Sequence, residues 1–157
     1  MKHTNDIFLD RGNGLPNHFR LKGFANGDGL VMVHPRLVEC LEQLRARLCD
    51  LFREEVWVII TDGIRTKQDN ERLAAKLGWT NQGGAVSPDS KHLTKYGGIA
   101  ADIKCFKAQK NAQGFRERIA QAIVGHQARK IFAYVKDDYG DGHVHVDCWD
   151  RKRGRVA

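Results

Sequence analysis

The clearest pattern along the chain is a helical spacing of apolar residues that begins at Pro35. Apolar positions recur at steps of three and four residues: Leu37, Val38, Leu41, Leu44, Leu48, Leu51 and Phe52. This spacing places them on one face of an amphipathic helix of about five turns, and proline suits the first helical position. The β-branched run at 56–61 predicts a buried strand, and Asp62-Gly63 predicts the turn that follows it.

The rest of the chain alternates between helical and extended patterns. Residues 66–77 predict a second helix that ends at Gly78, and 79–98 predict a long loop with several glycines. The remaining predictions are strands at 100–104, 130–135 and 143–148, a helix at 111–124 and a hairpin loop at 138–142. Because the order is mixed and the last two strands suit an antiparallel hairpin, we expect an α+β fold, with helices packed on a small antiparallel sheet.

Length and composition favour one globular domain over 1–157. Apolar residues make up 41% of the chain and charged residues 29%, which are ordinary globular values. Residues 1–34, rich in Gly, Asn and Asp, predict an irregular lead-in, and the basic tail at 150–157 predicts a frayed end. The four cysteines form no Cys-x-x-Cys pair, so we expect them to be reduced and mostly buried.

Charge and hydropathy restrict the environment and the partners. The formal net charge of +7 suits an anionic partner such as a cell-envelope polymer. The longest apolar run, at 56–60, is too short to span a bilayer. The N-terminus has no apolar stretch behind it, so we expect synthesis in the cytoplasm without a signal peptide.

Four residues carry the candidate chemistry: His92, then Asp102, then His143 and His145 in a His-x-His. Side chains alternate faces along a strand, so His143 and His145 should share one face. If the two strands are neighbours, Asp102 can meet His145 across the sheet, and His92 can close over the same point from the preceding loop.

Two imidazoles and one carboxylate are a suitable ligand set for Zn²⁺. They leave the fourth tetrahedral position open, which distinguishes a catalytic zinc from a structural one. The sequence therefore predicts a zinc hydrolase with His92, Asp102 and His145 as ligands, and Ser90 as a group that orients His92.

These motifs resemble those of the zinc D-Ala-D-Ala carboxypeptidases, a family that includes phage endolysins and belongs to one superfamily with lysostaphin and the hedgehog proteins. The matching elements are Ser90-x-His92, Gly98-x-Ala100-x-Asp102 and the terminal His143-x-His145. The resemblance extends over about 19–148, which leaves 1–18 as lead-in, and it implies a hedgehog/D-Ala-D-Ala peptidase-like fold.

The resemblance also assigns roles. It implies that His92, Asp102 and His145 bind zinc, that His143 lies beside the reacting group, and that Arg65 binds a carboxylate or carbonyl of the substrate. The family's usual acidic general base falls on Gly142 here, so the candidates for the base are His143, then Asp141, then Asp147. Two further departures are a His92-to-Asp102 spacing three residues longer than usual, and Ile64 in place of a tyrosine.

The implied activity is hydrolysis of peptidoglycan stem or cross-link peptides that contain D-amino acids, as a carboxypeptidase or an endopeptidase. A monomer that acts on the cell wall after release, like a phage lysin, fits this activity. One alternative is an inactive member that serves as a cell-wall or polyanion binding module. A nucleic-acid protein has only the charge in its favour, and the metallo-β-lactamase motif would need histidine where Cys148 stands.

Overall fold

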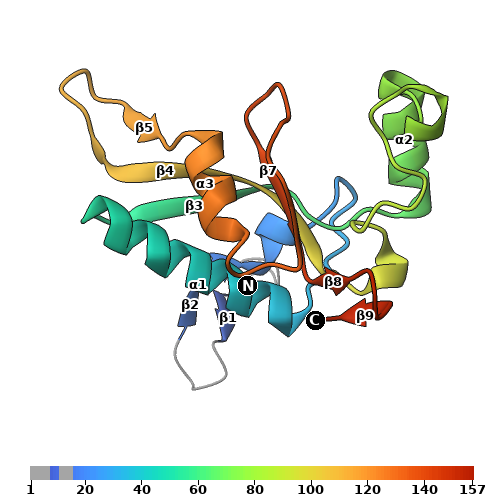
Figure 1. The fold of residues 1–157 in the computed structure, drawn as a ribbon, viewed down its shortest axis with the longest axis horizontal. Coiled ribbons are helices and arrows are strands. Elements are labelled where there is room, and N and C mark those ends of the chain that lie inside the picture. Colours follow the sequence, from blue (N-terminus) through green and yellow to red (C-terminus); the bar gives the residue numbers. More distant parts are fainter. Residues whose placement is uncertain (1–7, 11–15) are drawn as a thin grey trace.

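Helices α1 (Pro35–Phe52) and α3 (Gln121–Ala128) pack against an antiparallel sheet (Figure 1). A computed structural model describes residues 8–10 and 16–157. Among these residues, β3, β4, β7 and β6 lie side by side in that order, and β5 pairs with the far half of β4. Their bounds are Val56–Asp62 (β3), Ala100–Lys110 (β4), Arg116–Arg118 (β5), Tyr134–Lys136 (β6) and Val144–Asp147 (β7). The predicted α+β class with a small antiparallel sheet is confirmed.

Helix α1 (Pro35–Phe52) covers one face of this sheet, as its apolar spacing predicts. Its leucines at 37, 41, 44 and 48 are at most 1% exposed. Burying one leucine side chain fully contributes about 1.5–3 kcal/mol, so this face anchors the domain. The side chain of His34 accepts a hydrogen bond from the backbone of Arg36 and caps the helix. Helix α3 (Gln121–Ala128) contributes Val124 to the same buried cluster.

The register between β4 and β7 decides the position of the candidate site. Ala101 pairs with Val146 and Ile103 with Val144, and all four side chains belong to the core beneath α1. Asp102 therefore points to the other face, where its partner in the register is His145. The predicted meeting of Asp102 and His145 across the sheet is confirmed.

Helix α2 (Lys67–Leu77) begins at a capping box and lies at the end of the molecule away from the β4–β5 hairpin (Figure 1). Thr66 accepts from the backbone of Asp69, and the Asp69 carboxylate accepts from the backbone of Thr66. The long loop predicted after this helix is present, and it includes two short 3-10 turns, η3 (Thr80–Gln82) and η4 (Thr94–Tyr96).

Gly98 explains why a glycine precedes Asp102 in the motif. Its φ is +78°, and a Cβ at this position would lie 2.3 Å from the backbone oxygen of Met32. The backbone of His34 donates to the Gly98 carbonyl at 2.9 Å, so the segment before α1 is held against the start of β4. Only glycine permits this close approach.

The helix predicted at 111–124 is wrong. The side chain of Asn111 accepts from the backbones of Gln113 and Phe115 and closes a turn, after which β5 pairs with a β4 that runs on to Lys110. The helix forms later, as α3. The strand predicted at 130–135 is likewise shifted, because β6 starts only at Tyr134.

Both ends of the described chain are more regular than expected. The lead-in contains β1 (Phe8–Asp10), β2 (Pro16–Arg20) and the 3-10 helix η2 (Leu21–Phe24), and Phe19 and Phe24 are buried in the core. Residues 1–7 and 11–15 of the lead-in lie outside the described residues. The tail forms a hairpin of β8 (Trp149–Asp150) and β9 (Arg155–Val156), since the Asp150 carboxylate accepts from the backbones of Lys152 and Arg153.

All four cysteines are free, and Cys40, Cys105 and Cys148 are buried, as expected. Within 8–10 and 16–157, helices fall short of the length and hydropathy that crossing a membrane requires.

Candidate metal centre

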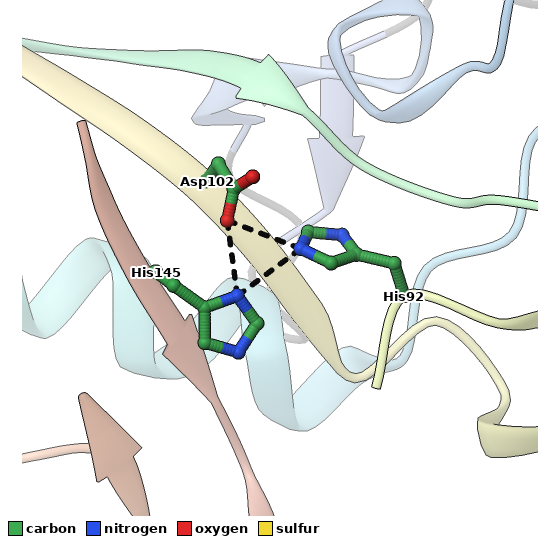
Figure 2. Close-up of side chains that lie close together, drawn as sticks. All are labelled: His92, Asp102 and His145. Carbon is green, nitrogen blue, oxygen red and sulfur yellow. Dashed lines mark hydrogen bonds and ion pairs between the residues drawn. The ribbon is translucent and has the colours of Figure 1, made fainter. Parts of the chain in front are cut away.

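Three side chains from separate segments converge on the face of the sheet opposite α1 (Figure 2). Asp102 comes from β4, His145 from β7, and His92 from the loop before η4. The Nε2 of His92 lies 3.1 Å from the Oδ1 of Asp102 and 3.1 Å from the Nδ1 of His145. The third side of the triangle, from His145 Nδ1 to Asp102 Oδ1, is 3.0 Å. All three residues are buried.

In each histidine, the ring nitrogen that faces away from the triangle lies beside a hydrogen-bond acceptor. This acceptor determines which of the two nitrogens carries the proton. The Nδ1 of His92 lies 2.6 Å from the carbonyl oxygen of Gly63, which can only accept, so Nδ1 is the donor. The Nε2 of His145 lies 3.0 Å from the carboxylate of Asp147 and donates to it in the same way. In the neutral rings, both inner nitrogens therefore direct lone pairs at the Asp102 carboxylate and at each other.

This convergence of lone pairs requires a positive charge at its centre. Two lone pairs and a carboxylate within 3.1 Å repel one another unless a cation or a proton lies between them. A tetrahedral ion with bonds of about 2.0–2.1 Å separates its ligand atoms by roughly 3.3 Å, close to the observed triangle. The group of His92, Asp102 and His145 could therefore hold a metal ion, as the sequence predicted.

The electrostatics of the group favour ionised Asp102. Burial alone would raise the pKa of Asp102, but the charge of His92 and the hydrogen bond from His145 outweigh burial and hold it well below its usual range. Burial would lower the pKa of His145, whereas hydrogen bonds to Asp102 and Asp147 raise it above its ordinary value. In the absence of an ion, His145 can thus take the proton that balances the carboxylate.

The backbone of the loop positions His92. Gly63 supplies the carbonyl that receives the ring, and a Cβ at Gly63 would lie 2.4 Å from the backbone oxygen of Phe24. The backbone of Arg65 donates to the His92 carbonyl at 2.8 Å. Ser90 was expected to orient the imidazole, but its hydroxyl accepts instead from the backbone N–H of His92 at 3.3 Å. Ser90 therefore shapes the loop, and Gly63 orients the ring.

His143 lies beside the three ligand candidates and is held from two sides. Its Nδ1 is 2.5 Å from the Oδ1 of Asp141, and its ring stacks on Tyr139 at 3.9 Å between centroids. Its Nε2 lies 3.6 Å from the Oδ2 of Asp102. Because Asp141 accepts from Nδ1, the Nε2 of His143 is free to face the site as a proton acceptor.

Asp147 is not available as a general base. It is 0% exposed, and its oxygens accept from His145, from the backbone of Trp149 and from the guanidinium of Arg151 at 2.9–3.1 Å. Arg151 in turn lies 3.8 Å above the ring of Tyr134. Asp147 instead holds the imidazole of His145, which leaves His143 and Asp141 as the better placed candidates for the base.

Arg65 reaches the site with its guanidinium already paired. Its Nε donates to the Oδ2 of Asp62 at 2.7 Å, and its Nη2 contacts the same carboxylate. The Nη2 also lies 3.6 Å from the Oδ2 of Asp102. Asp62 thus fixes the Arg65 cation at the edge of the candidate metal centre. The cation lies beside Oδ2 of Asp102, whereas the two imidazoles of the triangle contact Oδ1.

Sequence reasoning missed Asp62, Gly63, Tyr139 and Arg151. Asp62 and Gly63 could be noticed in the sequence, because they form a turn shortly before Arg65. The turn alone does not show that the carbonyl of Gly63 accepts a hydrogen bond from the distant His92. The stacking of Tyr139 on His143 and the pairing of Arg151 with Asp147 depend on how two hairpins close.

The chain was compared with known proteins. No protein-family model matches it, and no curated protein is significantly similar to it.

Proposed function

We propose that this protein is a zinc-dependent peptidase that hydrolyses peptidoglycan stem or cross-link peptides containing D-amino acids. The observation that carries the proposal is the triangle of His92, Asp102 and His145, with both inner nitrogens unprotonated in the neutral rings and the His143–Asp141 pair beside it. The motif resemblance and the ligand chemistry support this proposal, and we further propose that the α+β fold is of the hedgehog/D-Ala-D-Ala peptidase-like kind.

Zinc is the metal that best suits these residues. Two neutral imidazoles and one carboxylate match the three-ligand sets of catalytic zinc sites. When bound, zinc supplies Lewis acidity, which polarises a carbonyl group and lowers the pKa of water towards neutrality. The burial of the ligands keeps bulk water from screening that charge.

Residues of the chain supply the proton transfer. The Nε2 of His143 accepts a proton from the attacking water, and Asp141 stabilises the resulting imidazolium through Nδ1. The same nitrogen can then return the proton to the leaving amine. Asp141 therefore acts on His143 and does not replace it, which separates the first two candidates for the base.

Arg65 supplies the second positive charge beside the reacting carbonyl. Because Asp62 holds its guanidinium, the cation is oriented before the substrate arrives, and a fixed donor stabilises a developing oxyanion better than a mobile one. Recognition of D-amino acids rests on the resemblance, and the net charge of +7 suits an anionic cell wall. We further propose that the protein acts as a monomer, after release from the cytoplasm in which it is made.

The direct test is digestion of purified peptidoglycan, read by mass spectrometry of the released fragments. We expect cleavage by the parent protein, no cleavage with a chelator, and recovery when zinc is restored. Arg65→Ala should retain its metal and lose turnover, while His126→Ala, which replaces an exposed histidine on α3, should match the parent.

Two outcomes would overturn the proposal. Binding to peptidoglycan without cleavage, in zinc-loaded protein, would identify a binding module instead of an enzyme. Tight, salt-dependent binding to DNA with no action on peptidoglycan would favour a nucleic-acid protein.

A further inference from the structure

The sheet face that carries Asp102 continues along β4 as an exposed surface. Beyond Asp102, alternate residues of β4 on this face are Lys104 and Phe106, and their partners on β3 are Ile59 and Trp57. Strand β5 pairs with β4 as well, and from it the guanidinium of Arg116 lies 4.1 Å from the centre of the Trp57 ring. We call these five residues, Trp57, Ile59, Lys104, Phe106 and Arg116, the open-face platform.

The apolar residues of the platform do not serve the core. Val58 and Ile60, which alternate with them on β3, pack against the buried cluster beneath α1. Trp57 is 38% exposed and Ile59 is 43% exposed. Exposed aromatic and aliphatic side chains that adjoin a candidate site mark a binding surface more often than isolated apolar residues do.

The platform is continuous with the candidate metal centre. The Nζ of Lys104 lies 3.9 Å from the carboxylate of Asp141, which holds His143. Arg118, on the same strand as Arg116, donates to the Asp141 carbonyl at 3.3 Å. The surface therefore runs from His143 through Asp141 and Lys104 to Trp57 without leaving this side of the sheet.

The charges of the platform specify an anionic occupant. Lys104, Arg116 and the adjoining Arg118 are cations, whereas Asp141 is the acidic group within reach of Lys104. Glu117 points to the other face, where it pairs with Lys107. An apolar floor edged by guanidinium and ammonium groups suits a polymer that combines sugar rings, which stack on indole, with carboxylates, which pair with arginine.

Distance indicates the size of this occupant. Phe106 lies four residue steps beyond Asp102 on β4, which corresponds to roughly 13 Å along an extended strand. A terminal dipeptide extends only about 7 Å, so it cannot contact the metal centre and Trp57 together. An occupant that uses both must be part of a longer glycopeptide.

We propose that the open-face platform binds the carboxylate-bearing glycopeptide polymer on one side of the cleaved bond, so that the protein acts on polymeric peptidoglycan in preference to short sugar-free peptides. This inference rests on the proposed function and adds to it the form of the substrate, a polymer and not a short free peptide. Trp57 and Arg116 supply affinity for the polymer and take no part in the chemistry.

The test compares Trp57→Ala and Arg116→Ala with Phe115→Ala. Phe115 is 70% exposed and lies in the turn before β5, outside the five residues of the platform, so it is an aromatic control. Co-sedimentation with insoluble peptidoglycan in the presence of a chelator measures binding without cleavage. Release of fragments from the same material, and hydrolysis of a short sugar-free stem peptide, measure activity.

We expect both platform variants to bind and cleave the polymer about tenfold less well, as loss of an aromatic or arginine contact predicts. Their hydrolysis of the short peptide, and every property of Phe115→Ala, should match the parent. Equal losses on polymer and short peptide, or binding unaffected by Trp57→Ala, would overturn the inference even if the parent is an active peptidase. Trp57-dependent binding by a parent that cleaves nothing would uphold the platform and refute the proposed function. Binding to DNA that Arg116→Ala abolishes, with no binding to peptidoglycan, would show that the occupant is wrong.

Discussion

Asp147 shows how a single buried carboxylate can determine which nitrogen of a neighbouring histidine faces the candidate metal centre. Its carboxylate accepts a hydrogen bond from Nε2 of His145 at 3.0 Å and another from the guanidinium of Arg151. Burial raises the pKa of Asp147, but hydrogen bonds from His145 and Arg151 more than compensate and lower it overall. Asp147 therefore stays ionised and keeps the Nδ1 lone pair of His145 directed at the site.

Asp147→Asn should weaken metal binding without abolishing it. The amide lacks the charge that holds the imidazole and Arg151, and the loss of such a supporting carboxylate typically reduces metal affinity by about 10- to 100-fold. Competition titration against a chromophoric chelator measures the effect. Asp138→Asn removes a carboxylate that is 76% exposed and should leave the affinity unchanged. Equal affinities for all three proteins would refute this role.

For single residues, the sequence identifies the candidate metal ligands but not the groups that hold those ligands in place. His92, Asp102 and His145 stand in recognisable motifs, and the structure brings them together. Gly63 and Tyr139 act through a backbone carbonyl and a ring face, and neither kind of contact depends on a spacing that can be recognised in the chain. Asp147 was visible two residues beyond His145, but only its burial distinguishes a supporting carboxylate from a base.

Among the elements, α2 depends most clearly on its first turn. The Asp69 carboxylate accepts from the backbone of Thr66 at 2.8 Å and from the side chain of Asn26 at 2.9 Å. It thus completes the capping box and ties the helix to the segment before α1.

Asp69→Ala should lower the free energy of unfolding by about 0.5–2 kcal/mol, the usual cost of a lost cap. Urea denaturation followed by circular dichroism measures this difference. Glu71→Ala, on the exposed side of the same helix, is the matched control and should cost less. Equal stability of Asp69→Ala and the parent would show that the cap contributes nothing.

Asp89 stabilises the loop that carries His92 through hydrogen bonds and ion pairs within that loop. Its carboxylate contacts Lys95 Nζ at 2.6 Å, Tyr96 Oη at 2.5 Å and Lys91 Nζ at 2.9 Å. The hydrogen bonds from Lys95, Tyr96 and Lys91 hold the pKa of Asp89 well below its usual range. A depressed folded-state pKa means that Asp89 stabilises the fold above its unfolded-state pKa of about 3.9, and that this contribution disappears as the pH falls through the folded-state value.

Asp89→Asn should therefore be destabilised relative to the parent near neutral pH, and the difference should shrink as the pH falls below about 4. Denaturant unfolding of both proteins at a series of pH values tests this. A difference that stays constant down to the most acid conditions, or that grows, would contradict the assigned contacts.

The success of sequence reasoning varied between elements for physical reasons. Helix α1 is long and strictly periodic, so its pattern specifies it, and the Thr66–Asp69 pair marks the start of α2. The helix predicted at 111–124 failed because most of this segment forms a turn and β5, and only its last residues, from Gln121, lie in α3. In this segment, the turn at Asn111 and the pairing of β5 with β4 outweigh the local preference for a helix.

For the molecule as a whole, the order of the motifs predicts the site only if the correct strands are neighbours. The α+β class follows from the sequence, but the pairing of β4 with β7 is a long-range contact that no local pattern encodes. The same holds for the open-face platform, which needs β3, β4 and β5 together. The single-domain organisation over 1–157 and the monomeric state stay predictions.

The central claim is that His145 binds a metal and that His143, two residues earlier, does not. Metal content of the purified proteins tests this most directly, because both variants remove an imidazole from the same stretch of chain. The parent and His143→Ala should each carry one equivalent of zinc, and His145→Ala should carry none while remaining folded by circular dichroism. A folded His145→Ala protein that retains one equivalent of zinc would contradict the account.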